Sequence, residues 1–157
     1  DVSLKLGPYL APILSHFEKF LGKAYLDYCL DKKIIEFAPL QFIRGSSWEQ
    51  CICIAEEVQN AGINEIKAVV TRLGEDAQLI FACDNKQHDL RGTTGVEYIV
   101  NIIKKARKER PECLNTDEVN ELINNVAIVE FTQDDVVRSG LCRSFVKIFN
   151  NEEVNGK

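Results

Sequence analysis

The chain has 157 residues, 45% of them hydrophobic and 27% charged, which suits one globular domain with its own core. The formal net charge of -5 argues against a protein that coats nucleic acid over its whole surface, but it leaves room for a local basic groove. No apolar run reaches the roughly 20 residues that a membrane helix needs. The six cysteines include no CxxC pair, which favours reduced thiols over a zinc site. Because thiols stay reduced in the cytosol, we expect a cytoplasmic protein.

Predicted helices and strands alternate along the chain. Apolar spacing predicts helices over 7–31 with a break at Gly22, then over 63–73, 95–110, 117–124 and 134–150, the last capped by Thr132. β-branched and apolar runs predict strands over 34–43, 51–58, 77–84 and 125–131, and residues 151–157 are expected to form a frayed polar tail. This alternation predicts an α/β fold with a mostly parallel sheet flanked by helices.

Two of the predicted strands end in acidic residues. The first, expected to be buried on both faces, delivers Glu56 and Glu57, and the second ends at Asp84 with Gln87 close behind. Ligands of parallel α/β sheets bind at the carboxyl ends of the strands. Carboxylates and an amide there can hold hydrated Mg²⁺ and position a water molecule beside a phosphate. The alternative is that they are polar strand ends that meet solvent.

Two further features bear on phosphate binding. The P-loop pattern GxxxxGK[ST] is absent, and the nearest glycine-rich stretch, 92–95, reads as a helix N-terminal loop that could approach a phosphate weakly. A basic run suits either a helix C-terminus or a contact with the backbone of RNA or DNA. Its members are Lys104, Lys105, Arg107, Lys108 and Arg110.

Five short motifs follow one another along the chain. They are Ala38-Pro39-Leu40 with Arg44-Gly45; Glu56-Glu57-Val58-Gln59-Asn60; Thr71-Arg72-Leu73-Gly74; Cys83-Asp84 with Gln87 and Asp89-Leu90; and Phe131-Thr132 with Asp135-Val136-Val137-Arg138. In order and spacing, from about residue 6 to residue 149, they resemble the PhoH-like P-loop ATPases. Within that family, they are most similar to the phage-encoded members.

The resemblance implies a RecA-like P-loop NTPase core over residues 1–150, ATP and Mg²⁺ as ligands, RNA or another single-stranded nucleic acid as partner, and a homo-oligomer or a partner protein. It also implies roles for individual residues. Glu57 would polarise the attacking water, Gln59 and Gln87 would sense the γ-phosphate, and Arg138 would be an arginine finger. Asp84 and Arg72 would contact the nucleotide, Glu56 would hold the metal, and Arg44 would contact nucleic acid together with Lys104, Lys105, Arg107 and Lys108.

Departures from the family pattern leave two main hypotheses. The Walker A segment, with its strand, is expected upstream of Asp1, and Glu56, Val58 and Cys83 stand where the family has Asp, Ala and Gly. Either the chain is the C-terminal part of an ATPase that handles RNA or DNA, or it is a non-catalytic PhoH-like module that binds a protein or nucleic acid. A third hypothesis is a nuclease with Glu56, Glu57 and Asp84 as metal ligands.

Overall fold

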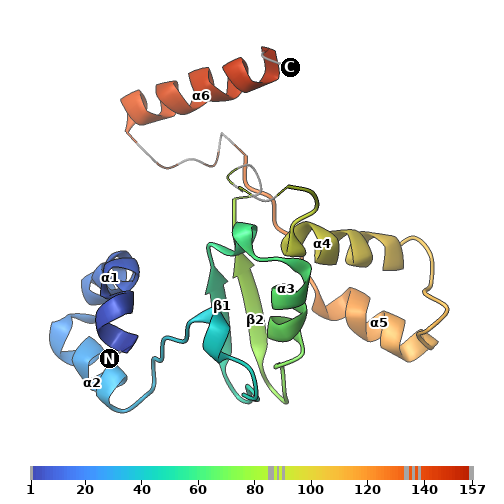
Figure 1. Ribbon diagram of the computed structural model, residues 1–157, viewed down its shortest axis with the longest axis horizontal. Helices are drawn as coiled ribbons and strands as arrows, with labels where there is room; N and C mark the ends of the chain where they lie inside the picture. The colour runs from blue at the N-terminus through green and yellow to red at the C-terminus, as the bar shows by residue number, and fades with distance from the viewer. Residues whose placement is uncertain are drawn as a thin grey trace. The chain divides into compact units, whose positions relative to one another are not determined.

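The computed structural model describes residues 2–84, 87, 89, 91–132, 135, 137 and 139–155 (Figure 1). The chain divides into two compact units, one formed by 1–55 with 64–80 and the other by 56–63 with 81–157. The described residues form helices and a two-stranded parallel sheet, so the predicted α/β class is confirmed. None of the described helices is long and apolar enough to cross a membrane.

The first unit begins with two helices that pack against each other, α1 (Val2–Leu21) and α2 (Lys23–Asp31). The predicted break at Gly22 is confirmed, because this residue has a φ of 77°, a value that glycine adopts without steric cost. α2 buries Leu26 and Cys29. Cys29 therefore serves as a small apolar core residue.

The strand predicted over 34–43 is wrong. Most of this segment is irregular, and it contains only the single 3₁₀ turn η1 (Leu40–Phe42). Pro39 starts that turn, and its carbonyl accepts a hydrogen bond from the Phe42 N–H at 2.9 Å. Proline has no N–H to give to a neighbouring strand, and the β-branched and aromatic composition could not compensate for this loss.

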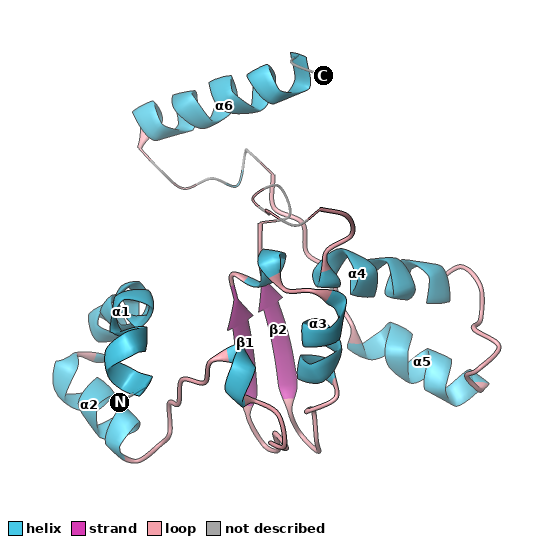
Figure 2. Ribbon diagram, viewed as in Figure 1, coloured by secondary structure: helices cyan, strands magenta, loops and turns pink. Residues whose placement is uncertain are grey.

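The sheet consists of β1 (Ile52–Glu56) and β2 (Gln78–Ala82), joined through α3 (Ile63–Val70). Figure 2 shows the two strands side by side and running in the same direction. Both predicted strands are thus confirmed, but with one face exposed instead of full burial: Ile52 and Ile54 are 66% and 55% accessible. A parallel sheet is buried on both faces only where helices cover both, and a single crossover helix covers one.

The helix predicted over 63–73 ends three residues early, at Val70, because the following residues pair with another segment. The Trp48 N–H donates to the Arg72 carbonyl at 2.8 Å, and the Gly74 N–H donates to the Trp48 carbonyl at 2.7 Å. Trp48 and Leu73 form a parallel bridge there. The chain leaves α3 to extend the pairing of the sheet, which periodicity within the helix could not reveal.

The second unit contains η2 (Val58–Asn60), α4 (Gly95–Ala106), α5 (Thr116–Asn125) and α6 (Gly140–Asn155). α4 packs against both η2 and α5. Capping boxes start two of these helices: Thr94 with Glu97 for α4, and Asn115 with Glu118 for α5. Thr94 is completely buried, so the beginning of α4 is fixed within the core of this unit.

The strand predicted over 125–131 is also wrong. No strand is present there, because β1 and β2 are the only paired strands in the described part of the chain. Val126 is extended, with φ −114° and ψ 127°, and its carbonyl accepts a hydrogen bond from Arg107 at 2.6 Å. Val129 and Phe131 are 74% and 84% exposed. The strand-like sequence thus lacks the neighbour that would make it a strand.

The last helix begins later and ends later than predicted. Thr132 does not cap it, because both its N–H and its hydroxyl donate to the Asp135 carboxylate, at 2.7 and 2.9 Å. Instead the Ser139 hydroxyl accepts from the Cys142 N–H at 3.4 Å, as an N-cap does. α6 then continues to Asn155, through most of the segment expected to be a frayed tail.

Candidate functional site

The end of β1 delivers a carboxylate and a buried amide. Glu57 adopts the left-handed conformation, with φ 55° and ψ 33°, which costs a non-glycine residue about 1–3 kcal/mol. Gln59 follows in η2, is only 5% exposed, and donates from Nε2 to the Glu57 carboxylate at 2.6 Å. Its other amide atom, Oε1, is buried and has no hydrogen-bond partner. The turn after β1 therefore brings two predicted catalytic residues into direct contact and leaves a buried acceptor unsatisfied.

The segment after β2 carries a second polar pair. The Gln87 amide donates to the Asp84 carboxylate at 2.9 Å, and the Gln87 N–H donates to the Asp84 carbonyl at 3.0 Å. Both residues are exposed and belong to the same unit as Glu57 and Gln59. The two pairs thus share one feature, a carboxylate that accepts a hydrogen bond from a glutamine.

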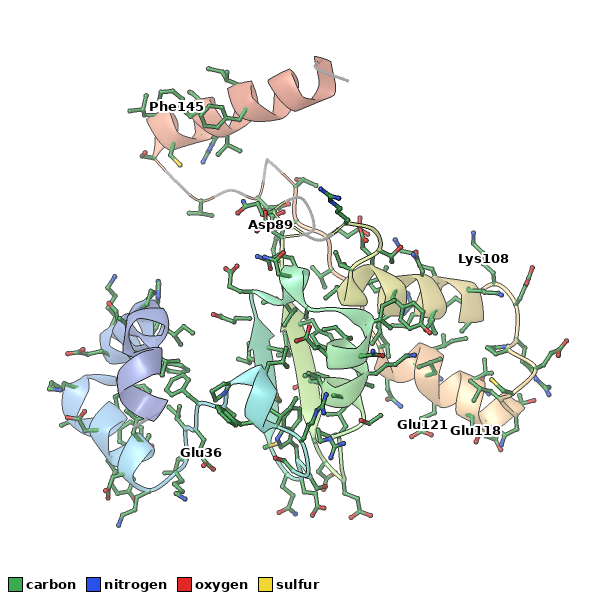
Figure 3. The ribbon with its side chains drawn as sticks, in the orientation of Figure 1. Glu36, Asp89, Lys108, Glu118, Glu121 and Phe145 are labelled. Carbon is green, nitrogen blue, oxygen red and sulfur yellow. The ribbon has the colours of Figure 1, made fainter. Side chains whose placement is uncertain are left out.

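Backbone and side-chain hydrogen bonds connect the segments that carry these pairs. The Asp89 N–H donates to the Asn60 side-chain oxygen at 2.8 Å, and the Gly95 N–H donates to the Ala61 carbonyl at 2.9 Å. Figure 3 shows Asp89 beside η2, as this bond requires. Sequence reasoning gave Asn60 no role, although its place directly after the Glu-Glu-x-Gln run was a signal.

The three acidic residues do not form a metal centre. Among the described residues, no group of three or more His, Cys, Asp or Glu side chains is arranged to hold a metal ion. Glu57 and Asp84 are each bonded to their own glutamine, and Glu56 is exposed at the end of β1. The nuclease hypothesis, which needed Glu56, Glu57 and Asp84 as joint ligands, therefore loses its basis.

Arginines of the first unit are engaged locally. The Arg72 guanidinium donates to the carbonyls of Ser46 and Ala68, both at 3.2 Å, and so ties the turn after Arg44 to the end of α3. Arg44 itself is exposed. Their nucleotide and nucleic-acid roles stay predictions. Arg138, the predicted arginine finger, lies outside the described residues.

Three of the five residues in the basic run from Lys104 to Arg110 form bonds with residues that follow the run in sequence. Lys104 forms an ion pair with Glu130 at 3.3 Å, Arg107 donates to the Val126 carbonyl, and Arg110 donates to the Leu114 carbonyl at 3.1 Å. Lys105 and Lys108 are exposed and line a shallow open depression together with Asn101, Lys104 and Glu109. Figure 3 shows Lys108 pointing away from α4. Lys105 and Lys108 are therefore better placed than Arg107 for a phosphate contact.

The N-terminus of α4 is not open to a phosphate in the way the sequence allowed. The Thr94 N–H donates to the Glu97 carboxylate at 3.0 Å, and the Gly95 N–H is bonded to Ala61. A carboxylate of the chain itself thus occupies the position that favours an anion. The sequence signal for this capping box is Thr94-x-x-Glu97.

Two thiols near the sheet, those of Cys53 and Cys83, have surroundings that raise their pKa. None of the six cysteines, all of which lie in the described part of the chain, forms a disulfide bond. Partial burial raises the pKa of the Cys53 thiol, with a further contribution from Cys51, and partial burial together with Asp84 raises the pKa of Cys83. Both shifts disfavour the thiolate, which is the reactive form.

Comparison with known proteins identifies the family. The sequence profile described as PhoH-like protein matches residues 1–150. The chain belongs to the PhoH-like family. It is 32% identical over 146 residues to protein PhoH of Escherichia coli K12, covering 91% of this chain and 37% of that protein. It is 28% identical over 152 residues to the PhoH-like protein of Bacillus subtilis 168, covering 97% of this chain and 43% of that protein.

Family membership indicates a biochemical class at the level of the family. PhoH-like proteins are P-loop ATPases, so ATP and Mg²⁺ are ligands at the level of the family, and the α/β fold described above is consistent with it. The chain spans about two fifths of the length of the curated relatives it matches, between 37% and 43% for those of Escherichia coli and Bacillus subtilis.

Proposed function

We propose that this PhoH-like chain supplies the water-positioning and sensor side of a Mg²⁺-dependent ATP site. The observation that carries this proposal is the Gln59 side chain, which is buried, bonded through Nε2 to Glu57, and left with an unsatisfied Oε1. A buried acceptor without a partner is costly, so such an atom favours an additional hydrogen-bond donor. A water molecule is the smallest donor that could serve both Gln59 and the neighbouring carboxylate.

The donor set fits one side of a Mg²⁺–ATP complex. Mg²⁺ is commonly held by one or two carboxylates, with the remaining positions filled by waters and substrate phosphates, so Glu56 or Asp84 would suffice as a protein ligand. The two hydrogen-bonded pairs consist of carboxylates and amides and include no cation. The 157 residues also contain no GxxxxGK[ST] sequence. The proposal therefore requires a phosphate-binding element from outside these residues.

Bound Mg²⁺–ATP would supply a γ-phosphoryl group for transfer to water. In this proposal Glu57 accepts the proton of the attacking water, and Gln59 holds Glu57 in its left-handed turn and orients that water. Positioning and electrostatic stabilisation account for most phosphoryl-transfer catalysis, so a preformed contact of 2.6 Å between the base and its orienting amide favours this role. Asp84 and Gln87 form the sensor pair of the second strand.

The test compares Glu57→Gln with Glu121→Gln in the intact native protein. Glu121 is exposed on α5, which makes it a matched control (Figure 3). Loss of a general base typically lowers turnover by about 10²–10⁴-fold, so Glu57→Gln should abolish most hydrolysis and keep Mg²⁺-dependent ATP binding. Equal hydrolysis by both variants refutes the role of Glu57. Absence of ATP binding by the wild type favours the alternative, a non-catalytic module.

A single-stranded nucleic acid, RNA in the first instance, is the partner we propose for either alternative. Support comes from Lys105 in α4 and Lys108 just after it, which are exposed, while Lys104, Arg107 and Arg110 hold neighbouring segments. Exposed cations attract the phosphate backbone without reading sequence. This contact is compatible with an acidic protein, because five of its 19 basic residues fall within the seven positions from Lys104 to Arg110.

A protein partner or a second copy of the chain is also part of the proposal. Apolar side chains are exposed on β1, where Ile52 and Ile54 are 66% and 55% accessible, and on α6, where Phe145 and Phe149 are 49% and 58% accessible. Exposed apolar surface of this kind is typical of surfaces that are covered in an assembly.

A further inference from the structure

Asn60 ends the Glu56–Asn60 run and lies where two segments of the site meet. Its Oδ1 accepts a hydrogen bond from the Asp89 N–H at 2.8 Å, and the next residue, Ala61, accepts one from the Gly95 N–H at 2.9 Å. Asp89 is therefore bonded to the last residue of η2, and Gly95, the first residue of α4, to the residue that follows η2. One of these bonds comes from the backbone, and the other depends on the side chain of Asn60.

The two ends of the Asn60 bond differ in how firmly they are held. On the η2 side, Val58 and Gln59 are buried and α4 packs against the turn. On the other side, Asp84, Gln87 and Asp89 are all exposed. The bonds between Gln87 and Asp84 join two residues on this same side. They cannot set its position relative to η2.

We propose that Asn60 is a positioning residue that fixes the Asp84–Gln87 pair relative to the Glu57–Gln59 pair. This inference rests on the proposed function, in which the two pairs act on one nucleotide. Asn60 contacts neither pair directly. It acts by holding the backbone of Asp89, two residues beyond Gln87, against the turn that carries Glu57 and Gln59. An asparagine suits this task because its short amide presents an acceptor oxygen to a backbone N–H close by.

The first test measures amide hydrogen exchange at Asp89. Asn60→Leu removes the acceptor at similar size, Asn60→Asp keeps an acceptor oxygen, and Asn120→Leu on the exposed face of α5 is the matched control. Loss of one ordinary hydrogen bond should raise exchange at the Asp89 amide by about fivefold in Asn60→Leu. Asn60→Asp and Asn120→Leu should exchange as the wild type does. Wild-type exchange in Asn60→Leu overturns the proposal.

The second test separates positioning from folding. In the intact native protein, Asn60→Leu should lower kcat for ATP hydrolysis by about tenfold, within the range by which small misplacements reduce catalysis, and leave KM for ATP unchanged. Asn60→Asp should restore kcat. An unchanged kcat despite faster exchange at Asp89 overturns the positioning role. A wild-type protein that neither binds nor hydrolyses ATP refutes the proposed function, whereas the exchange test still decides whether the tether exists.

Discussion

Gly74→Ala tests the pairing of the Trp48 segment with the residues after α3. A β-carbon at position 74 would lie 2.6 Å from the Cγ of Glu49 and 2.9 Å from the Trp48 carbonyl oxygen. The Glu49 side chain is exposed and can swing away. The Trp48 carbonyl cannot, because it accepts the Gly74 N–H at 2.7 Å. The substitution therefore forces the two backbones apart.

The expected loss follows from the contacts that must change. Overpacking a site of this kind costs about 1–3 kcal/mol, and weakening the two backbone hydrogen bonds of Trp48 adds about 1 kcal/mol. The free energy of unfolding should thus fall by roughly 2–4 kcal/mol, which for a chain of this size lowers Tm by roughly 4–15 °C. Thermal unfolding followed by circular dichroism at 222 nm measures this shift.

Gly7→Ala is the matched control. No atom lies within 4 Å of a β-carbon at Gly7, which is part of α1. Alanine is the better helix former by about 1 kcal/mol, so Gly7→Ala should keep or raise Tm. If Gly74→Ala unfolds at the wild-type temperature, the close approach of Gly74 to Trp48 is not a constraint and the reasoning fails.

Two further predictions concern charge. Hydrogen bonds from the Thr132 backbone and, to a smaller extent, from its hydroxyl lower the pKa of Asp135 below the ordinary 3.8. This bonding should therefore stabilise the protein above pH 3.8, and the stabilisation should be lost as the pH falls through the depressed pKa. Tm measured from pH 6 down to pH 2 should fall less steeply in Asp135→Asn than in the wild type, and equal slopes would contradict this. Replacing both Lys105 and Lys108 by Gln should lower the slope of log K against log salt for single-stranded RNA by about 1.4, whereas Gln at Lys32 and Lys33 should leave it unchanged. An unchanged slope in the variant that carries Gln at both positions 105 and 108 would exclude Lys105 and Lys108 from the contact with RNA.

Local patterns accounted for much of the fold. Apolar spacing correctly predicted α4 from Gly95, and both paired strands were found from their apolar runs, whereas the start signal read at Thr132 did not begin α6. Of the two predicted strands that failed, 125–131 had an equally suitable composition, whereas 34–43 contained Pro39. A strand requires a neighbour to receive its hydrogen bonds, and composition does not report whether that neighbour exists.

The candidate site divides in the same way. The sequence by itself determined which polar residues follow β1 and β2, and through its motifs it determined the PhoH-like family. Only the tertiary structure decided that Gln59 is buried, that Arg107 holds the Val126 carbonyl, and that Asn60 accepts from the Asp89 N–H. The physical reason is distance along the chain. Spacing governs contacts within a helix or turn, whereas the bonds of Arg107 and Asn60 join residues 19 and 29 positions apart, which meet only after folding.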